Sequence, residues 1–448
     1  MAGSESGTWR MEQLELLVNP GAPPIEGALE VRDGRICALG PDLPPPAPGV
    51  ERLDRRGMVA LPGFVQGHVH LCQSLMRGLA EERPLDRWLR ECIWPLEAAH
   101  DPASLRASAR LGLAEALLHG TTSLLDMGAV RDPDVIAECV AEFGLRAILG
   151  PALMDEGDGV PPPLCRPRAE ALAAAVDFNR RWAGAADGRI GVAFAPRFAL
   201  SVSAGLWREL AREAQLQGWP IHTHVSETRW ENQQAEALHG ARPVPLLAQW
   251  GVLAARTMLV HGVWLDDRDR ALLAGAPAAV IHCPGSNAKL GSGIADLPAL
   301  RAAGIPIGIG SDGAACNDQL SMLAELRLTA QLQSLRHGPG RWSAAETVAC
   351  ATSGGARALG LERSVGRLAV GQRADVILFE RAATDWEADL PWEHGLVYAA
   401  GGLRPQEVYI DGIARVHAGR LLVADEQEVR RTAREQRRRL IARATGSD

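Results

Sequence analysis

The sequence predicts an α/β protein in which a parallel (β/α)8 TIM-type barrel carries a small β-sandwich domain formed from both ends of the chain. Short apolar runs alternate with helix-like stretches across residues 61–365, and this alternation is typical of a parallel barrel. Strand-like text in residues 1–60 returns in residues 366–424, so the flanking domain is expected to be composite. Residues 425–448 are expected to form a charged helical tail.

The elements follow in order along the chain. Strand-like runs at 14–20, 27–40 and 55–65 are separated by turns, and the Pro-rich segment 41–49 is interpreted as a surface turn rather than a PxxP ligand. Barrel strands are predicted at residues 64–70, 121–128, 145–154, 189–198, 219–225, 257–265, 278–285 and 305–312. Their apolar character and length are those of strands buried on both faces.

Helical periodicity fills the intervals between these strands. Residues 104–120, 203–218 and 320–335 are predicted helices, and the last has apolar residues at i, i+3, i+4 and i+7. The tail is also helical over residues 425–443. Its arginines stand at 430, 431, 434, 437, 438, 439 and 443 among acidic residues. A solvated helix is favoured there over an interaction tail.

Composition excludes several classes of protein. The 448 residues contain 47 basic and 54 acidic side chains, a net charge of −7, which argues against a basic surface for nucleic acid. No run of about 18 uncharged apolar residues occurs, so no membrane span is expected. The start of the chain has no apolar signal region, and its eight cysteines form no CxxC pair, so a cytoplasmic location is expected.

Histidines and carboxylates gather at the ends of the predicted barrel strands. His68 and His70 end the first strand, and residues two apart on a strand point to the same face. The fifth strand ends in His222 and His224, with Glu227 three residues later. His261 stands in the sixth strand and Asp312 ends the eighth. Since barrel enzymes place their chemistry at the carboxyl ends of strands, these residues predict a metal site.

Two other patterns are set aside. Residues 308–313 read GIGSDG and formally match GxGxxG, but a dinucleotide fingerprint belongs in an early βαβ unit with an acid about 20 residues later. His282, beside Cys283, is interpreted as a packing histidine rather than a ligand.

The ordered motifs PGFVQGHVH, IHTHVSE, LVHG, HCPGSN, KLGSGIA and SDGAACND resemble the amidohydrolase superfamily. More narrowly, they are similar to its cytosine, adenosine and guanine deaminase branch and the related triazine hydrolases. The resemblance covers about residues 10–425. It implies a metal-dependent hydrolase barrel, and a homodimer is a family-level expectation.

The resemblance implies one divalent metal ion per subunit, held by His68, His70, His224 and Asp312. Such a His3Asp site suits zinc, and also iron or manganese. The fourth predicted strand has no lysine to carboxylate, which favours a single metal. By the same resemblance, His261 holds the attacking water, Glu227 shuttles protons to the substrate ring, and Asp312 also accepts the water's proton.

The segment after His70 resembles that of 5'-methylthioadenosine/S-adenosylhomocysteine deaminases. There Trp88 would wall the pocket and Glu97 would bind ribose hydroxyls. This predicts hydrolytic deamination of an adenosine-type nucleoside: 5'-deoxyadenosine, 5'-methylthioadenosine or S-adenosylhomocysteine. The third strand carries Pro151 near the position where many such enzymes place an arginine for the amino-acid carboxylate, which disfavours S-adenosylhomocysteine itself.

Two alternatives stay open. Gln73, Arg197 and Phe198 match positions at which guanine deaminases hold a purine, so the substrate could be a free aminated heterocycle: guanine, 8-oxoguanine, a pterin or an s-triazine. The other alternative is a metal-binding homologue without catalytic activity. It is disfavoured because every catalytic position is intact.

Overall fold

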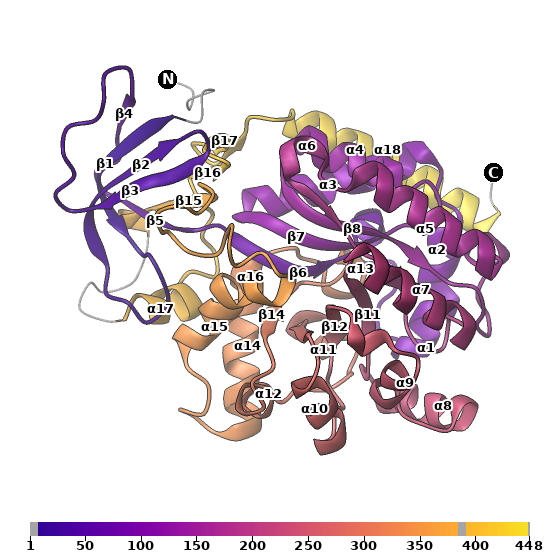
Figure 1. The fold of residues 1–448 in the computed structure, drawn as a ribbon. Helices are drawn as coiled ribbons and strands as arrows, with labels where there is room; N and C mark the ends of the chain where they lie inside the picture. Colours follow the sequence, from indigo (N-terminus) through magenta and orange to yellow (C-terminus); the bar gives the residue numbers. More distant parts are fainter. Residues whose placement is uncertain (1–7, 384–390, 447–448) are drawn as a thin grey trace.

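The computed structural model describes residues 8–383 and 391–446 (Figure 1). Its centre is made of parallel strands in two sheets. In the first, β6 (Phe64–Val69), β7 (Thr121–Gly128) and β8 (Arg146–Leu153) pair in sequence order, and β8 also pairs with the short β9 (Ile190–Val192) and β10 (Ala195–Pro196).

The second sheet contains β11 (Ile221–Val225), β12 (Thr257–His261), β13 (Ala278–His282) and β14 (Ile307–Ile309), again parallel and in order. The two sheets touch at both edges. Phe194 forms a parallel bridge with Ile221, and the Asp312 N–H donates to the His68 carbonyl at 3.1 Å. This parallel order is the one expected for the strands of a TIM-type barrel.

The predicted helices are present, and two of them have a side-chain cap at the amino end. α3 (Pro102–Leu118) begins at Asp101, whose carboxylate accepts the Ser104 N–H in a capping box. α7 (Ala204–Gln217) is capped by the Ser203 hydroxyl, and α14 spans Met322–His337. The helices cover the outer side of the parallel strands (Figure 1). Loops connect the carboxyl ends of these strands to the helices that follow them.

Both chain ends enter one nine-stranded sheet beside the barrel strands (Figure 1). The amino-terminal strands are β1 (Trp9–Leu16), β2 (Ile25–Arg32), β3 (Arg35–Gly40), β4 (Glu51–Asp54) and β5 (Met58–Pro62). The carboxyl-terminal strands are β15 (Val376–Glu380), β16 (Glu407–Ile410), β17 (Ile413–His417) and β18 (Arg420–Leu421). Antiparallel pairing of β5 with β15 joins the two groups.

The terminal sheet curls back on itself. β15 and β5 lie between β16 and β1 in the sheet order, yet the rings of Trp9 and Tyr409 are only 5.1 Å apart. Alternate residues of β15 face different cores: Val376 packs inside the curled sheet, whereas Ile377 packs with the barrel. The sequence predicted a small β-sandwich formed from both ends of the chain. The described strands belong to one nine-stranded sheet, in which the β5–β15 ladder joins the two groups.

The charged carboxyl-terminal segment forms α18 (Glu426–Thr445), and one face of this helix is buried against the molecule. Leu440 is fully buried, and the Arg443 guanidinium donates to the Ala99 carbonyl at 2.8 Å and to the Ser104 hydroxyl at 2.9 Å. The helix was expected to be solvated, but this is true of only part of its surface. Among the described residues, no helix has the length and apolar character needed to cross a bilayer.

Candidate active site and metal centre

The four predicted metal ligands lie together at the carboxyl ends of their strands. One ligand atom from each of His68, His70, His224 and Asp312 falls within 4.8 Å of the others. Asp312 Oδ1 is 3.2 Å from His68 Nε2 and 3.6 Å from His70 Nε2. Spacing along β6 and β11, together with the loop after β14, therefore produces one compact cluster.

The hydrogen bonds of two of these histidines test whether a cation fits. His70 Nδ1 is 2.8 Å from the Met127 carbonyl, and His224 Nδ1 is 2.7 Å from the Arg197 carbonyl. A carbonyl only accepts, so each Nδ1 carries the proton and each Nε2 presents a lone pair. Burial lowers the pKa of His70 to about 3 and that of His224 well below its usual value, so neither ring holds a second proton at neutral pH.

These two Nε2 atoms face each other at 3.3 Å. Two lone pairs at that distance repel unless a cation lies between them. His68 Nε2 is also buried, and within the described residues it forms no well-oriented hydrogen bond, although Asp312 Oδ1 lies 3.2 Å away. Imidazole nitrogens and a carboxylate are the donors that zinc and related divalent metals prefer, so the residues present fit such an ion.

Asp312 and His261 are held in unusual backbone conformations. Their φ angles are +64° and +73°, in the left-handed region that side chains other than glycine seldom adopt. Burial opposes ionisation of Asp312, but the interaction with His68, followed by those with the other nearby histidines, keeps its pKa well below the usual range. The Ser286 hydroxyl donates to Asp312 Oδ2 at 2.7 Å. Strain of this kind persists where the surrounding structure holds a functional group in place.

Glu227 and His261 lie beside the cluster. His261 Nε2 is 3.5 Å from Glu227 Oε2 and 3.9 Å from Asp312 Oδ2, and its Nδ1 is 2.8 Å from Asn287 Oδ1. Burial raises the pKa of Glu227, and the Ser292 hydroxyl donates to its Oε1 at 3.0 Å. The arrangement therefore places the Glu227 carboxyl group, which can carry a proton, near the Asp312 carboxylate, which can accept one.

A helix start fixes the backbone of Glu227. Thr228 caps α8 (Arg229–His239), as the T-x-x-E pattern predicts, by accepting the Glu231 N–H at 3.1 Å. The Glu231 carboxylate reaches back to the N–H groups of Ser226 and Glu227, at 3.1 and 2.7 Å. Burial raises the pKa of Glu231 to about 7.

The supporting roles of several residues were not predicted from the sequence. His222 Nε2 is 2.9 Å from His68 Nδ1 and so holds that ring. Asn287 and Ser292 belong to the HCPGSN and KLGSG motifs, which could have identified them. His282 is fully buried and has no hydrogen-bond partner within the described residues, in line with the predicted packing role.

The cavity beside the cluster contains most of the predicted substrate residues. Its lining is His70, Gln73, Leu85, Trp88, Leu89, Arg197, Phe198, His224, Glu227, Glu231, His261, Leu290 and Asp312. α1 (Leu85–Trp88) and the π-helical turn η2 (Leu89–Ile93) form an apolar roof. The roof leaves about 30 Å³ of free volume, the share of roughly one water molecule.

Glu97 is placed differently from the prediction. Its carboxylate does not line the cavity but binds Arg197 at 2.5 and 3.1 Å and accepts the Gln73 side-chain amide at 2.9 Å. Burial opposes the charge of Glu97, but Arg197 holds its pKa below the usual value. Glu97 therefore reaches the cavity through Gln73 and Arg197. Glu97, which favoured a nucleoside substrate, therefore forms one network with Gln73 and Arg197, which favoured a free base.

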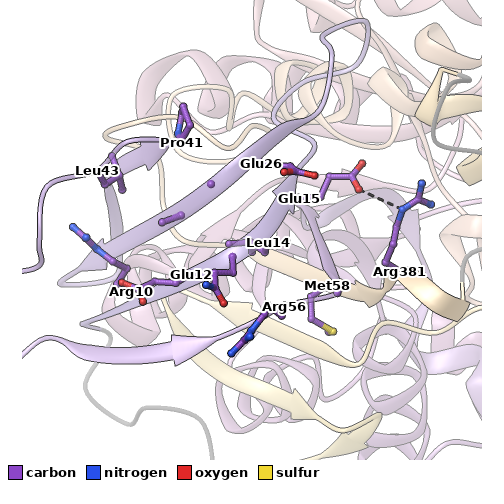
Figure 2. Close-up of a pocket in the computed structure, with 14 residues that line it drawn as sticks. Arg10, Glu12, Leu14, Glu15, Glu26, Pro41, Leu43, Arg56, Met58 and Arg381 are labelled. Atoms are coloured by element: carbon purple, nitrogen blue, oxygen red, sulfur yellow. Dashed lines mark ion pairs between the residues drawn. The ribbon is translucent and has the colours of Figure 1, made fainter.

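A larger cavity, of about 770 Å³, lies in the terminal sheet (Figure 2). It is bordered by β1, where Gln13 has a φ of +60° at a break in the register with β2. Glu15 stands opposite Glu26 and pairs with Arg381 at 3.4 Å. None of the clustered ligands lines this cavity, so it is separate from the metal centre.

Comparisons with known proteins identify the family of the chain. The amidohydrolase family pattern matches residues 59–414. The chain is 36% identical over 425 residues to the 5-methylthioadenosine/S-adenosylhomocysteine deaminase of Desulforudis audaxviator, covering 93% of this chain and 95% of that protein. It is 35% identical over 411 residues to the 5'-deoxyadenosine deaminase of Methanothermobacter thermautotrophicus, covering 90% and 92%.

A solved structure gives the same result. An adenosine deaminase from Xanthomonas campestris with bound zinc superposes with a TM-score of 0.89 at 30% identity, covering 97% of this chain and 99% of that one. Together with the His/His/His/Asp cluster, this similarity supports a divalent metal centre. The family match covers most of the sequence. The chain belongs to the amidohydrolase family.

Proposed function

We propose that the protein hydrolytically deaminates an adenosine-type nucleoside, such as 5'-deoxyadenosine or 5'-methylthioadenosine, and releases ammonia. The observation that carries this proposal is the position of Glu227 and His261 beside the His68, His70, His224 and Asp312 cluster. The deaminases of D. audaxviator and M. thermautotrophicus support it through their named substrates.

The cluster is proposed to hold one divalent metal ion per subunit, with zinc favoured by the zinc-bound solved structure. A bound metal supplies Lewis-acid chemistry that lowers the pKa of water from 15.7 to about 7. Asp312 is proposed to accept the proton lost by the water. The Gly313 N–H at 2.7 Å and the Ser286 hydroxyl at 2.7 Å hold its carboxylate in a fixed orientation.

Glu227 is proposed to deliver a proton to the ring nitrogen, so that the adjacent amino-bearing carbon accepts the water oxygen. The deprotonated Glu227 then takes the proton of the new hydroxyl group and passes it to the amino group, which leaves as ammonia, and the proton held by Asp312 returns Glu227 to its starting form. Its raised pKa, caused first by burial, suits a group that must be protonated at the start. His261 orients the water from between the two carboxyl groups.

The lining of the cavity indicates which 5' substituent on the nucleoside would fit. Leu85, Leu89, Leu290 and Phe198 contribute apolar surface and Trp88 an aromatic one, which suits a hydrogen or a methylthio group. Arg197 is the one arginine or lysine among the lining residues, and Glu97 already neutralises it. An amino-acid carboxylate would therefore find no free arginine or lysine in that lining.

A second candidate is deamination of a free aminated heterocycle. The Gln73 amide and the Arg197 guanidinium line the cavity and could bind the edge of a purine or triazine directly. The two candidates differ in their dependence on Glu97, because a free base has no ribose for the Gln73–Glu97–Arg197 network to recognise.

The test is ammonia release from zinc-loaded protein, measured with 5'-deoxyadenosine, 5'-methylthioadenosine, adenine, guanine and an aminotriazine. The proposal expects turnover of the nucleosides, abolished in His68→Ala and retained in Asp267→Asn, a fully exposed control. Turnover of free bases alone would favour the second candidate. Bound metal without turnover of any compound would refute both.

We also propose the corresponding division of the chain. Residues 61–365 act as one closed (β/α)8 barrel, residues 1–60 with 366–424 as the composite β domain, and 425–448 as the terminal helical segment. The contacts at both edges of the parallel sheets support closure.

A further inference from the structure

A groove with two adjoining cavities lies between α3, α18 and η1 (Leu71–Met76). The cavities have volumes of about 140 and 180 Å³ and share Arg77, Leu111 and Arg430. Leucine, alanine and valine side chains contribute its apolar surface: Leu75, Leu111, Ala114, Leu118, Val429 and Ala433. No residue of the metal cluster lines either cavity.

The charged residues of the groove are unbalanced. The guanidinium groups are those of Arg77, Arg404, Arg430, Arg434 and Arg437, and the carboxylates are those of Glu115 and Glu426. Glu115 pairs with Arg77 at 2.5 Å and Glu426 accepts the Leu421 N–H at 3.2 Å. In the part of the chain that the structure describes, the other four arginines form no ion pair with an acid.

The arginines of the groove share one face of α18. Residues 426, 430, 433, 434 and 437 recur at helical spacing and lie on that face. Elsewhere on the helix, Arg439 pairs with Glu435 at 2.6 Å and Arg443 with Asp101 at 3.1 Å, whereas Arg431 and Arg438 are exposed. The whole chain carries a net charge of −7, so the charge of the groove is opposite in sign to that of the chain as a whole.

The like charges are close enough to perturb each other. Burial, followed by the charge of Arg77, lowers the pKa of the Arg437 guanidinium. The Nε of Arg77 is buried and has no hydrogen-bond partner among the described residues. Arginine stays charged at neutral pH, so an anion between these groups would remove repulsion and supply acceptors.

We propose that this groove binds a small phosphate-bearing anion, with Arg77, Arg430, Arg434 and Arg437 as its ligands. Guanidinium groups bind phosphate oxygens in pairs, and several converging arginines favour a multiply charged phosphate. The apolar surface formed by Leu111 and its neighbours gives room for an organic portion beside the phosphate. The site is distinct from the catalytic cavity and independent of the proposed deamination.

The test uses zinc-loaded full-length protein in chloride buffer, with inorganic phosphate, pyrophosphate and AMP titrated separately by calorimetry. Arg430→Gln/Arg434→Gln removes two exposed charges from the groove. Arg431→Gln/Arg438→Gln removes the same charge from exposed positions of α18 that do not line it. Wild type and the second variant should bind one anion, with affinity at least 10-fold tighter than the groove variant.

Comparing the three anions identifies the source of the phosphate. Tighter binding of AMP than of inorganic phosphate would assign the apolar surface to a nucleoside portion, and equal binding would assign the site to phosphate alone. Equal loss of binding in both variants would mean that the overall charge of the protein, and not the groove, determines anion binding, and it would overturn the proposal. Absence of binding by all three anions at millimolar concentration would also overturn it, as would binding of an RNA oligonucleotide alone.

Discussion

The buried pair of Glu97 and Arg197 gives a prediction that can be worked through quantitatively. Its bonds of 2.5 and 3.1 Å make it bidentate, and the side chains are only 8% and 5% exposed. Removing one partner of such a pair leaves an uncompensated buried charge and costs about 3–5 kcal/mol. Arg197→Met should therefore lower the free energy of unfolding by this amount, and Glu97→Gln by a comparable one.

The double variant Arg197→Met/Glu97→Gln should lose less than the sum of the two, because no charge is left buried without a partner. Gln73 can still hydrogen-bond the new amide. The expected coupling is about 2–3 kcal/mol, within the range for directly contacting residues. Urea unfolding of zinc-loaded protein, followed by tryptophan fluorescence, measures all four members of the cycle.

The exposed pair Arg90–Asp158 is the matched control, because its side chains are 39% and 84% exposed and its bond is 2.6 Å. Its cycle should give a coupling below about 1 kcal/mol. Additivity of the Glu97 and Arg197 substitutions within about 0.5 kcal/mol would refute the buried network. So would a coupling no larger than that of the control.

Three further predictions concern catalysis, metal and pH. Glu227→Gln should lower kcat by about 10²–10⁴-fold with unchanged metal content by elemental analysis, and a kcat near wild type would exclude it as the proton carrier. Removing the metal with a chelator should lower the Tm, since the facing nitrogens of His70 and His224 lose their counter-charge, and zinc should restore it; a Tm indifferent to both treatments would contradict the site. Burial raises the pKa of Glu325 to about 7, above its unfolded value, so the native state binds the extra proton and stability should fall as pH rises from about 5 to 7. Glu325→Gln should flatten that fall in urea unfolding, and an equally steep profile in the variant would show that another group causes it.

The metal cluster could be predicted from the sequence because its information is local. Two residues on one strand, such as His68 and His70, share a face, and parallel strands bring their carboxyl ends to one edge. Strand ends also brought His222, His224, His261 and Asp312 to this edge, whereas the choice of His224 and Asp312 as ligands rested on the family resemblance. The composite terminal sheet was likewise foreseeable from strand-like text at both ends, although its curled, continuous form depends on pairing between β5 and β15.

Other features depend on contacts between distant segments. Gln73, Glu97 and Arg197 come from different elements. Neither their spacing along the chain nor their residue types show that Arg197 forms an ion pair with the Glu97 carboxylate. The docking of α18 on α3 was equally hidden, since its apolar residues are few and its arginines suggest solvent. The unusual φ angles of His261 and Asp312 are imposed by their surroundings and have no signature in the residues themselves.

The closed roof over the catalytic cavity has a consequence for affinity. About 30 Å³ of free space is too small for a nucleoside, so the lining of the cavity must rearrange when substrate binds. Where only a fraction of the molecules has the wider cavity, the apparent dissociation constant is the intrinsic one divided by that fraction. Lys289, the one lysine of the sequence, pairs with Glu81 at 2.8 Å in the segment that leads into α1. This ion pair is partly exposed and screened by salt, so we expect higher ionic strength to loosen that segment without altering the groups that carry out the reaction.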